Sequence, residues 1–304
     1  MIPIVRVAIG FSSFIQTTGR DTYVESAFRY ATLSFMQSAR ASAVDSSNPW
    51  SGHFGLCSVT LRTLAWRDVI NLAVEAGLSV IEWGADFHAP PDKSEQLIEI
   101  RKKCAEVNLR IGSYGSYWRA GATSDADGEQ ILRGAVLLGA PRVRIWAGVR
   151  GSRDVKDHER LEIIRQTQRL ADIARVDDIE LAFEYHANTL TDSAQSALKL
   201  IQEVDRENVH LYWQPPNNMS DDEVLESLTQ VLQHICAIHV FSWWPDQVRL
   251  PLSKRGDMWI SIFSRLANAN KMIDLLIEFV PDDNPQLIKS ESAYLQFIGG
   301  KTLE

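Results

Sequence analysis

Residues 179–204 read "IELAFEYHANTLTDSAQSALKLIQEV", and they contain one complete strand–turn–helix unit. The first six residues are mostly apolar and end on Glu184, whereas residues 191–204 carry apolar side chains at helical spacing. Glu184 and His186 lie two positions apart, so on a strand both side chains point to the same face. A buried charge needs an ionic partner or a metal. The pair is therefore either a satisfied structural contact or half of a site.

The same strand–helix rhythm occurs eight times. The predicted strands are residues 54–59, 79–83, 110–114, 142–146, 179–184, 209–213, 236–241 and 272–279. The predicted helices are residues 65–77, 93–107, 127–139, 158–175, 191–204, 220–233, 257–270 and 284–298, and Ser220 with Glu223 has the spacing of a capping box. Strict alternation predicts a parallel sheet, and eight units predict an α/β fold of the (β/α)₈ TIM barrel type over residues 53–304. An open doubly wound sheet is the structural alternative, but no Gly-rich fingerprint follows the first strand.

The bulk composition fits one enzyme-sized domain. The chain has 304 residues, of which 45% are hydrophobic, and a TIM barrel takes about 250 residues. The net charge of −8 lacks the basic surface that binds nucleic acid or an acidic membrane. No apolar run approaches the roughly 20 residues that span a bilayer. Cys57, Cys104 and Cys236 have no metal-type spacing, and we expect them to be buried small apolar residues of a reducing compartment rather than a disulfide framework. A cytoplasmic location is expected.

Residues 1–52 have a different composition from the rest of the chain. They are rich in Ser, Thr and Arg and contain few acids. We interpret them as an extra N-terminal segment, either helical or disordered, or as the product of an upstream start. The composition also weakly resembles a transit peptide, so organelle targeting stays open.

Polar and aromatic side chains gather where the predicted strands end, and the catalytic groups of a TIM barrel lie at this end. Four of them, Glu184, Gln214, His239 and Glu278, follow four consecutive strands. Each alone has a structural explanation, namely a hydrogen-bonded histidine, a salt-bridged glutamate or an amide that caps a loop. Together they offer the oxygen and imidazole ligands that suit Mn²⁺, Mg²⁺, Co²⁺ or Zn²⁺. The combination favours a metal site.

Several longer motifs resemble a known family. They are "AVEAGLSVIEWGADFHAPP" (73–91), "GSYGSYWRAG" (112–121), "APRVRIWAG" (140–148), "VHLYWQPP" (209–216), "IHVFSWWP" (238–245) and "LLIEFV" (275–280). From about residue 54 to 298 the chain resembles the sugar phosphate isomerase/epimerase family, which has the xylose isomerase-like TIM barrel. That family holds one divalent metal with Glu, Asp, His and Glu after strands 5 to 8. Glu184, His239 and Glu278 match this pattern, whereas Gln214 stands where Asp is usual, which removes one negative charge.

The resemblance implies a metal-dependent isomerase or epimerase that acts on a keto-sugar or a sugar derivative through an enediolate. One divalent ion is expected, with Mn²⁺ as the first choice and Co²⁺, Mg²⁺ or Zn²⁺ open, and it would polarise the substrate carbonyl. Glu184 and Glu278 would then move the proton as base and acid. The residues expected to contact the substrate are Glu82, His88, Tyr114, Arg144, Trp146, His186, Trp213 and Trp243.

Three alternatives differ in chemistry. The same intermediate could expel a leaving group, as in a lyase or dehydratase on a keto-glycoside or an inosose-type substrate. An apurinic endonuclease shares the barrel, but it needs a cluster of about three zinc ions, and this acidic chain has seven His and no phosphate-binding face. A catalytically silent sugar-binding barrel is the third alternative, and Gln214 supports it. No Gly-rich phosphate loop is visible, which favours a substrate without phosphate, and a homo-oligomer is common in the resembled family.

Overall fold

The computed structural model describes residues 50 and 52–301. The predicted N-terminal segment therefore lies outside the described residues, apart from Trp50 and Gly52. Trp50 is fully buried, and its ring packs edge-on against Phe263 with the ring centroids 5.4 Å apart. Trp50 therefore takes part in the packing of the barrel.

Eight parallel strands close into a barrel in the order β1-β2-β3-β4-β5-β6-β7-β10, and β10 pairs with β1. Their bounds are β1 Phe54–Cys57, β2 Val80–Gly84, β3 Arg110–Arg119, β4 Arg142–Trp146, β5 Glu180–Glu184, β6 Val209–Trp213, β7 Ile235–Val240 and β10 Asp274–Ile277. The predicted TIM barrel is confirmed. β3 continues five residues beyond its predicted end, because "GSYWR" extends toward the mouth of the barrel beside β4.

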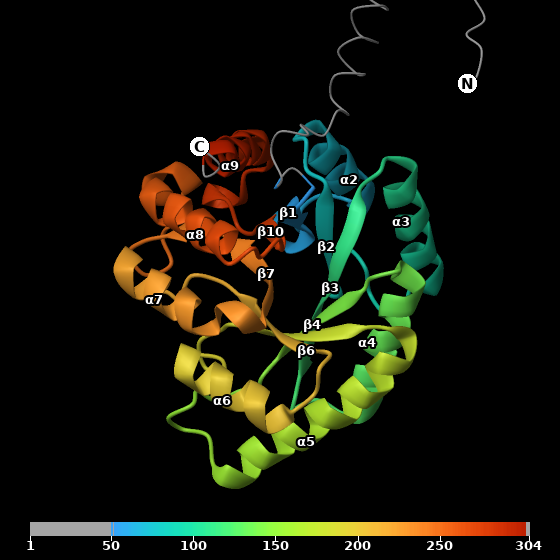
Figure 1. The fold of residues 1–304 in the computed structure, drawn as a ribbon. Helices are drawn as coiled ribbons and strands as arrows, with labels where there is room; N and C mark the ends of the chain where they lie inside the picture. The colour runs from blue at the N-terminus through green and yellow to red at the C-terminus, as the bar shows by residue number, and fades with distance from the viewer. Residues whose placement is uncertain (1–49, 51, 302–304) are drawn as a thin grey trace, which may run out of the picture. The chain divides into compact units, whose positions relative to one another are not determined.

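The helices surround the strands (Figure 1). Their bounds are α2 Trp66–Glu75, α3 Ser94–Glu106, α4 Asp125–Leu138, α5 Asp157–Ala174, α6 Ala194–Val204, α7 Asp221–Val231, α8 Gly256–Asn268 and α9 Ile288–Lys301. Ser220 and Glu223 form the predicted capping box at the start of α7. None of the helices within residues 52–301 combines the length and the apolar character that crossing a bilayer requires.

Short elements complete the loops. The 3₁₀ turns are Ser58–Leu61, Arg175–Asp177, Leu232–His234, Leu252–Arg255, Pro281–Asp283 and Pro285–Leu287, and a small hairpin joins β8 (Ser242–Trp243) to β9 (Arg249–Leu250). The predicted first strand ends early because Ser58 begins a 3₁₀ turn. The last helix begins four residues later than predicted, because Pro281 and Pro285 start separate turns.

Alternation along the strands divides the side chains into two cores. Val80, Ala182, Tyr212, Ala237 and Leu276 form a small apolar layer inside the barrel. The larger core lies between the strands and the helices. Successive side chains of a strand point alternately into the barrel and toward the helices. Only those predicted site residues that point into the barrel can therefore reach its mouth.

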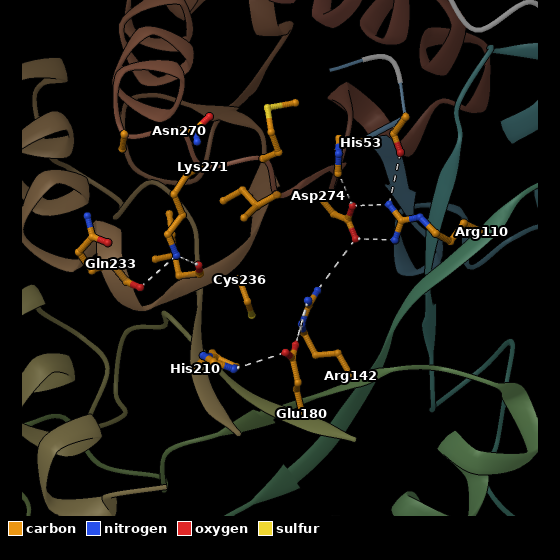
Figure 2. A pocket seen from close by; sticks show the side chains of 15 residues that line it. His53, Arg110, Arg142, Glu180, His210, Gln233, Cys236, Asn270, Lys271 and Asp274 are labelled. Atoms are coloured by element: carbon orange, nitrogen blue, oxygen red, sulfur yellow. Dashed lines mark hydrogen bonds and ion pairs between the residues drawn. The ribbon is translucent and has the colours of Figure 1, made fainter. Parts of the chain in front are cut away.

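Ion pairs line a cavity of about 810 Å³ at the N-terminal end of the barrel. Figure 2 shows Asp274 between Arg110 and His53, and Arg142 next to Glu180. Arg110 donates to Asp274 at 3.0 Å, and Arg142 donates to Glu180 at 3.1 Å. These residues lie at the starts of their strands, far from the ends that carry the candidate site. We assign them a structural role.

We expect the Asp274→Asn variant to lose about 2 kcal/mol of unfolding free energy at neutral pH, and to lose less in acid. Burial alone would raise the pKa of Asp274, but hydrogen bonds from His53 and Arg110 and the charges of Arg110 and Arg142 lower it to about 2. A pKa that is lower in the folded state contributes stability above the unfolded value near 4, and this stability is lost as the pH falls toward 2. Urea denaturation across this pH range measures both proteins. A stability difference independent of pH would contradict the assignment.

Candidate active site

A cavity of about 610 Å³ opens at the C-terminal ends of the strands. Its wall includes four inward side chains: Arg144 within β4, Glu184 at the end of β5, and Gln214 and Glu278 directly after β6 and β10. Parallel strands bring their carboxyl ends to one edge, so residues separated by up to 134 positions meet here. The volume lies in the range typical of small-molecule sites.

Three of the predicted ligands converge at the base of this cavity. Glu184, His239 and Glu278 each offer one ligand atom, and these atoms lie within 4.8 Å of one another. Gln214 belongs to the same group, because its Oε1 lies 3.0 Å from Nδ1 of His239. Nδ1 also lies 3.3 Å from Oε2 of Glu278. Two carboxylates, an amide oxygen and an imidazole nitrogen form a donor set that fits one divalent cation.

A second acid lies deeper in the barrel. Glu82 has no solvent exposure, and its Oε1 accepts a hydrogen bond from Nε of Arg144 at 3.1 Å. Arg144 also forms an ion pair with Glu184. Burial alone would raise the pKa of Glu82, but the charge of Arg144 and the hydrogen bonds from His239 and Ser113 outweigh burial and hold that pKa well below its usual value. Gly115 makes room for the pair, since a Cβ there would lie 2.7 Å from Glu82 and 2.8 Å from Arg144.

Two triads of ligand-type side chains exist within the described residues, and access to the cavity distinguishes them. Cys57, Glu82 and His239 form the second triad. Cys57 and Glu82 have no solvent exposure and do not line the cavity, whereas Glu184 and Glu278 both line it. Burial, followed by the charges of Glu82 and Glu278, raises the pKa of the Cys57 thiol well above its ordinary value, so the thiol is poorly suited as a ligand. The triad of Glu184, His239 and Glu278 therefore fits a metal better.

The backbone next to Glu278 is strained. Phe279 has a φ of 53°, in the left-handed region that a bulky residue adopts at a cost of about 1–3 kcal/mol. Thr60 stabilises this turn, because its hydroxyl accepts the N–H of Phe279 at 3.0 Å and donates to the carbonyl of Ile277 at 3.4 Å. The turn follows β10 directly, and it holds the Glu278 side chain toward His239.

The "FEYH" stretch places its residues by alternation. Glu184, Tyr185 and His186 all line the cavity, but the Tyr185 ring belongs to the outer core, where its hydroxyl lies 3.1 Å from the hydroxyl of Ser227 on α7. The His186 ring lies against Trp146, with the ring centroids 4.3 Å apart. Burial lowers the pKa of His186, so the ring is neutral over a wider pH range.

The structure brings some of the predicted substrate contacts to the cavity and leaves others outside it. Arg144, Trp146, His186 and Trp243 line the cavity. Tyr114 and Trp213 are fully buried in the outer core, because they alternate with the inward residues of β3 and β6. His88 is also buried, with its two nitrogens near the hydroxyl of Ser58 and the carbonyl of Leu64.

Glu82 differs most from its predicted place. The sequence predicted a substrate contact, whereas the structure places Glu82 inside the barrel below the cavity, with buried partners on both oxygens. His239, predicted as a ligand at the mouth, is also fully buried and lies beneath Gln214. Both residues point inward before the ends of their strands, β2 and β7, so their depth depends on strand tilt and register.

Several residues near the site were not singled out by sequence. Cys57 donates to Glu82 at 3.1 Å, Ser113 donates to Glu82 at 2.8 Å, and Thr60 holds the turn after Glu278. Cys57 ends β1 and Ser113 has the inward parity of β3, so alternation counted from the strand ends could have identified both. The three cysteines are free, as their spacing predicted.

Comparison with known proteins supports the same architecture. Residues 70–297 match the family model described as "Xylose isomerase-like TIM barrel", which is more than half of the chain. The chain belongs to the xylose isomerase-like TIM barrel family. A 3-dehydroshikimate dehydratase of Bacillus anthracis is 24% identical over 243 residues, which cover 72% of this chain and 85% of that protein.

Solved structures of this family superimpose on most of the chain. A probable 3-DHS dehydratase from Bacillus anthracis gives a TM-score of 0.68 at 18% identity and covers 80% of this chain and 98% of its own. A xylose isomerase-like TIM barrel protein from Mycobacterium smegmatis in complex with magnesium gives a TM-score of 0.65 at 15% identity, and the match covers 85% of this chain and 99% of that protein. D-psicose 3-epimerase from Clostridium cellulolyticum H10 gives a TM-score of 0.61 at 13% identity, and the match covers 83% of this chain and 96% of that protein. These likenesses show the fold.

Proposed function

We propose that this chain is a divalent-metal-dependent enzyme that removes the proton beside the carbonyl of a sugar or a sugar-like hydroxyketone. The observation that carries the proposal is the convergence of Glu184, His239 and Glu278 within 4.8 Å at the base of the mouth cavity. These residues and Gln214 would hold the ion. When bound, a divalent ion supplies Lewis-acid polarisation of the carbonyl, which makes the neighbouring proton removable.

Glu278 is the candidate base. It lies on the cavity wall, and among the described residues no Lys or Arg forms an ion pair with it, so its carboxylate is available to the substrate. Glu184 differs, because the guanidinium of Arg144 engages it. Trp146 and His186 form one aromatic wall, and Trp243 with Phe279 forms another, with ring centroids 5.7 Å apart. β4 and β10 lie on opposite sides of the barrel, so the two walls would hold a substrate between them and exclude water.

Arg144 pairs with Glu184 but not with Glu278, and this difference between the two carboxylates favours a reaction in which Glu278 alone acts as base. In a dehydration, Glu278 takes the proton beside the carbonyl, the C–H electrons form a double bond, and the hydroxyl on the next carbon departs. The same carboxyl returns its proton to that hydroxyl, so the net loss is one water. The 24% identity to a 3-dehydroshikimate dehydratase supports a lyase of this type.

An isomerase or epimerase is the second candidate. The presence of two glutamates in one ligand group favours it, since two carboxylates can exchange protons on opposite faces of a substrate. A single base can also return the proton to the neighbouring carbon, which gives an isomer. The first proton removal is common to both candidates.

The test loads the purified protein with Mn²⁺ after chelation and incubates it with a panel of hydroxyketones, namely keto-sugars, keto-glycosides and cyclic hydroxyketones, in deuterated water. We expect about one ion per chain, with deuterium entering the carbon beside the carbonyl. Mass spectrometry then separates the candidates, because a lyase product has lost one water, whereas an isomer keeps all the atoms of the substrate and differs in mass only by the deuterium that it has gained. No bound ion and no exchange on any compound would support the silent sugar-binding barrel instead.

Gln214→Asp is expected to tighten Mn²⁺ binding. A carboxylate would replace the amide oxygen near Nδ1 of His239 and add one negative charge to the donor set. We expect roughly a tenfold lower dissociation constant, equivalent to about 1.4 kcal/mol, measured by titration calorimetry. Unchanged affinity would show that Gln214 is not a ligand. Asn217→Asp, on the same cavity wall after β6, controls for charge in the mouth.

A further inference from the structure

Glu82 is enclosed by donors on both oxygens. Its Oε1 lies 3.1 Å from Nε of Arg144, 3.1 Å from the thiol of Cys57 and 3.3 Å from Nε2 of His239. Its Oε2 accepts the hydroxyl of Ser113 at 2.8 Å. With no exposed surface, the carboxylate is not placed to meet a substrate in the cavity above it. Its contacts are with other residues of the site.

The contact with His239 constrains the imidazole. A neutral imidazole carries one N–H, and a carboxylate that engages Nε2 favours the proton on that nitrogen. Nδ1 then presents its lone pair toward Oε1 of Gln214 at 3.0 Å and Oε2 of Glu278 at 3.3 Å. A lone pair that faces two oxygen acceptors is favourable when a cation lies among them, so this tautomer belongs to the metal-bound protein. The Tyr212 ring lies against the imidazole, with the centroids 4.5 Å apart, and limits its rotation.

We infer that Glu82 is a positioning residue, which orients His239 so that Nδ1 points into the donor set of Glu184, Gln214 and Glu278. The inference deepens the proposed function and rests on it. Carboxylates that accept the second N–H of a ligating histidine fix its tautomer and its ring orientation. Glu82 supplies this contact from β2, a strand that contributes none of the four donors.

The same carboxylate reaches a second member of the donor set. Arg144 binds Glu82 through Nε and forms an ion pair with Glu184 through Nη1. Glu82 therefore holds His239 directly and Glu184 through one intervening guanidinium. Glu82 lies 157 residues from His239 and 62 residues from Arg144 along the chain, so these contacts form only when the barrel closes.

The first experiment compares Mn²⁺ affinity in the wild type, Glu82→Gln and Asp274→Asn. The control removes a buried carboxylate that also has arginine and histidine partners, but at the opposite end of the barrel. We expect Glu82→Gln to bind Mn²⁺ about 10–100-fold more weakly and Asp274→Asn to bind like the wild type. Wild-type affinity in Glu82→Gln would overturn the inference alone, whereas a wild type that binds no Mn²⁺ would overturn the proposed function and this inference with it.

A second measurement needs no change at Glu82. Selective ¹⁵N labelling of histidine in the Mg²⁺-loaded wild type reports which ring nitrogen carries the proton, and loss of one signal set in His239→Gln assigns it. We expect His239 to carry its proton on Nε2, with the proton signal shifted downfield by the carboxylate of Glu82. A proton on Nδ1 in the loaded protein, or an Nε2 proton that exchanges freely with water, would overturn the inference.

Discussion

Glu278→Gln should lower the rate of deuterium exchange into a hydroxyketone substrate by about 10²–10⁴-fold, while the fold stays intact. The amide keeps the size of the side chain but accepts no proton, and Glu278 is the carboxylate of the ligand triad that lacks a guanidinium partner. Exchange is followed by NMR with Mg²⁺ as the ion, at saturating concentration, so that weaker metal binding does not determine the result. Circular dichroism verifies the fold.

Two further variants complete this experiment. Glu180→Gln changes a carboxylate at the opposite end of the same barrel, and it should exchange at the wild-type rate. Glu184→Gln should also lose activity, but it additionally leaves Arg144 with one carboxylate instead of two. Exchange at the wild-type rate in Glu278→Gln would exclude this residue as the base.

Arg144→Met should lower the unfolding free energy of the metal-free protein by about 3–5 kcal/mol. Arg144 has 2% exposure and pairs with both Glu82 and Glu184. Removing the guanidinium leaves two buried carboxylates facing each other across the barrel without a cation, and the desolvation cost of both then stays uncompensated. Denaturant unfolding in the presence of a chelator measures the loss.

A double variant tests the cause of that loss. Glu82→Gln combined with Arg144→Met removes one of the stranded charges, so it should recover part of the stability lost in Arg144→Met alone. Adding a divalent ion to the single variant should also restore stability, because the ion would supply a positive charge next to Glu184. A single variant as stable as the wild type would show that the ion pair contributes nothing to the fold.

The barrel follows from local patterns that the sequence displays directly. Eight apolar runs alternate with amphipathic segments, and Ser220 with Glu223 caps α7 as their spacing indicates. The donor arc was also accessible from sequence, because the carboxyl ends of parallel strands share one edge of a barrel. Glu184, His239 and Glu278 could be placed together before their distances were known.

Orientation and pairing came only from the tertiary structure. Tyr114 and Trp213 are neighbours of inward residues, and because side chains alternate along a strand they face the helices. Which residues face inward depends on the register of each strand, which the sequence does not give. His88 lies away from the cavity because Ser58 and Leu64 engage its nitrogens, and both come from the turns after β1.

The chain by itself thus determined the element order and the set of polar residues at the mouth, since both depend on side chains close together in sequence. It could not determine that Arg144 would take Glu82 and Glu184 as partners, or that Glu82 would reach His239 across 157 residues. Those contacts depend on how far each strand tilts and where the barrel closes. A buried charge pairs with the opposite charge or hydrogen-bond donor that barrel closure brings close to it. The distance between the two groups depends on the tertiary structure and cannot be read from local sequence.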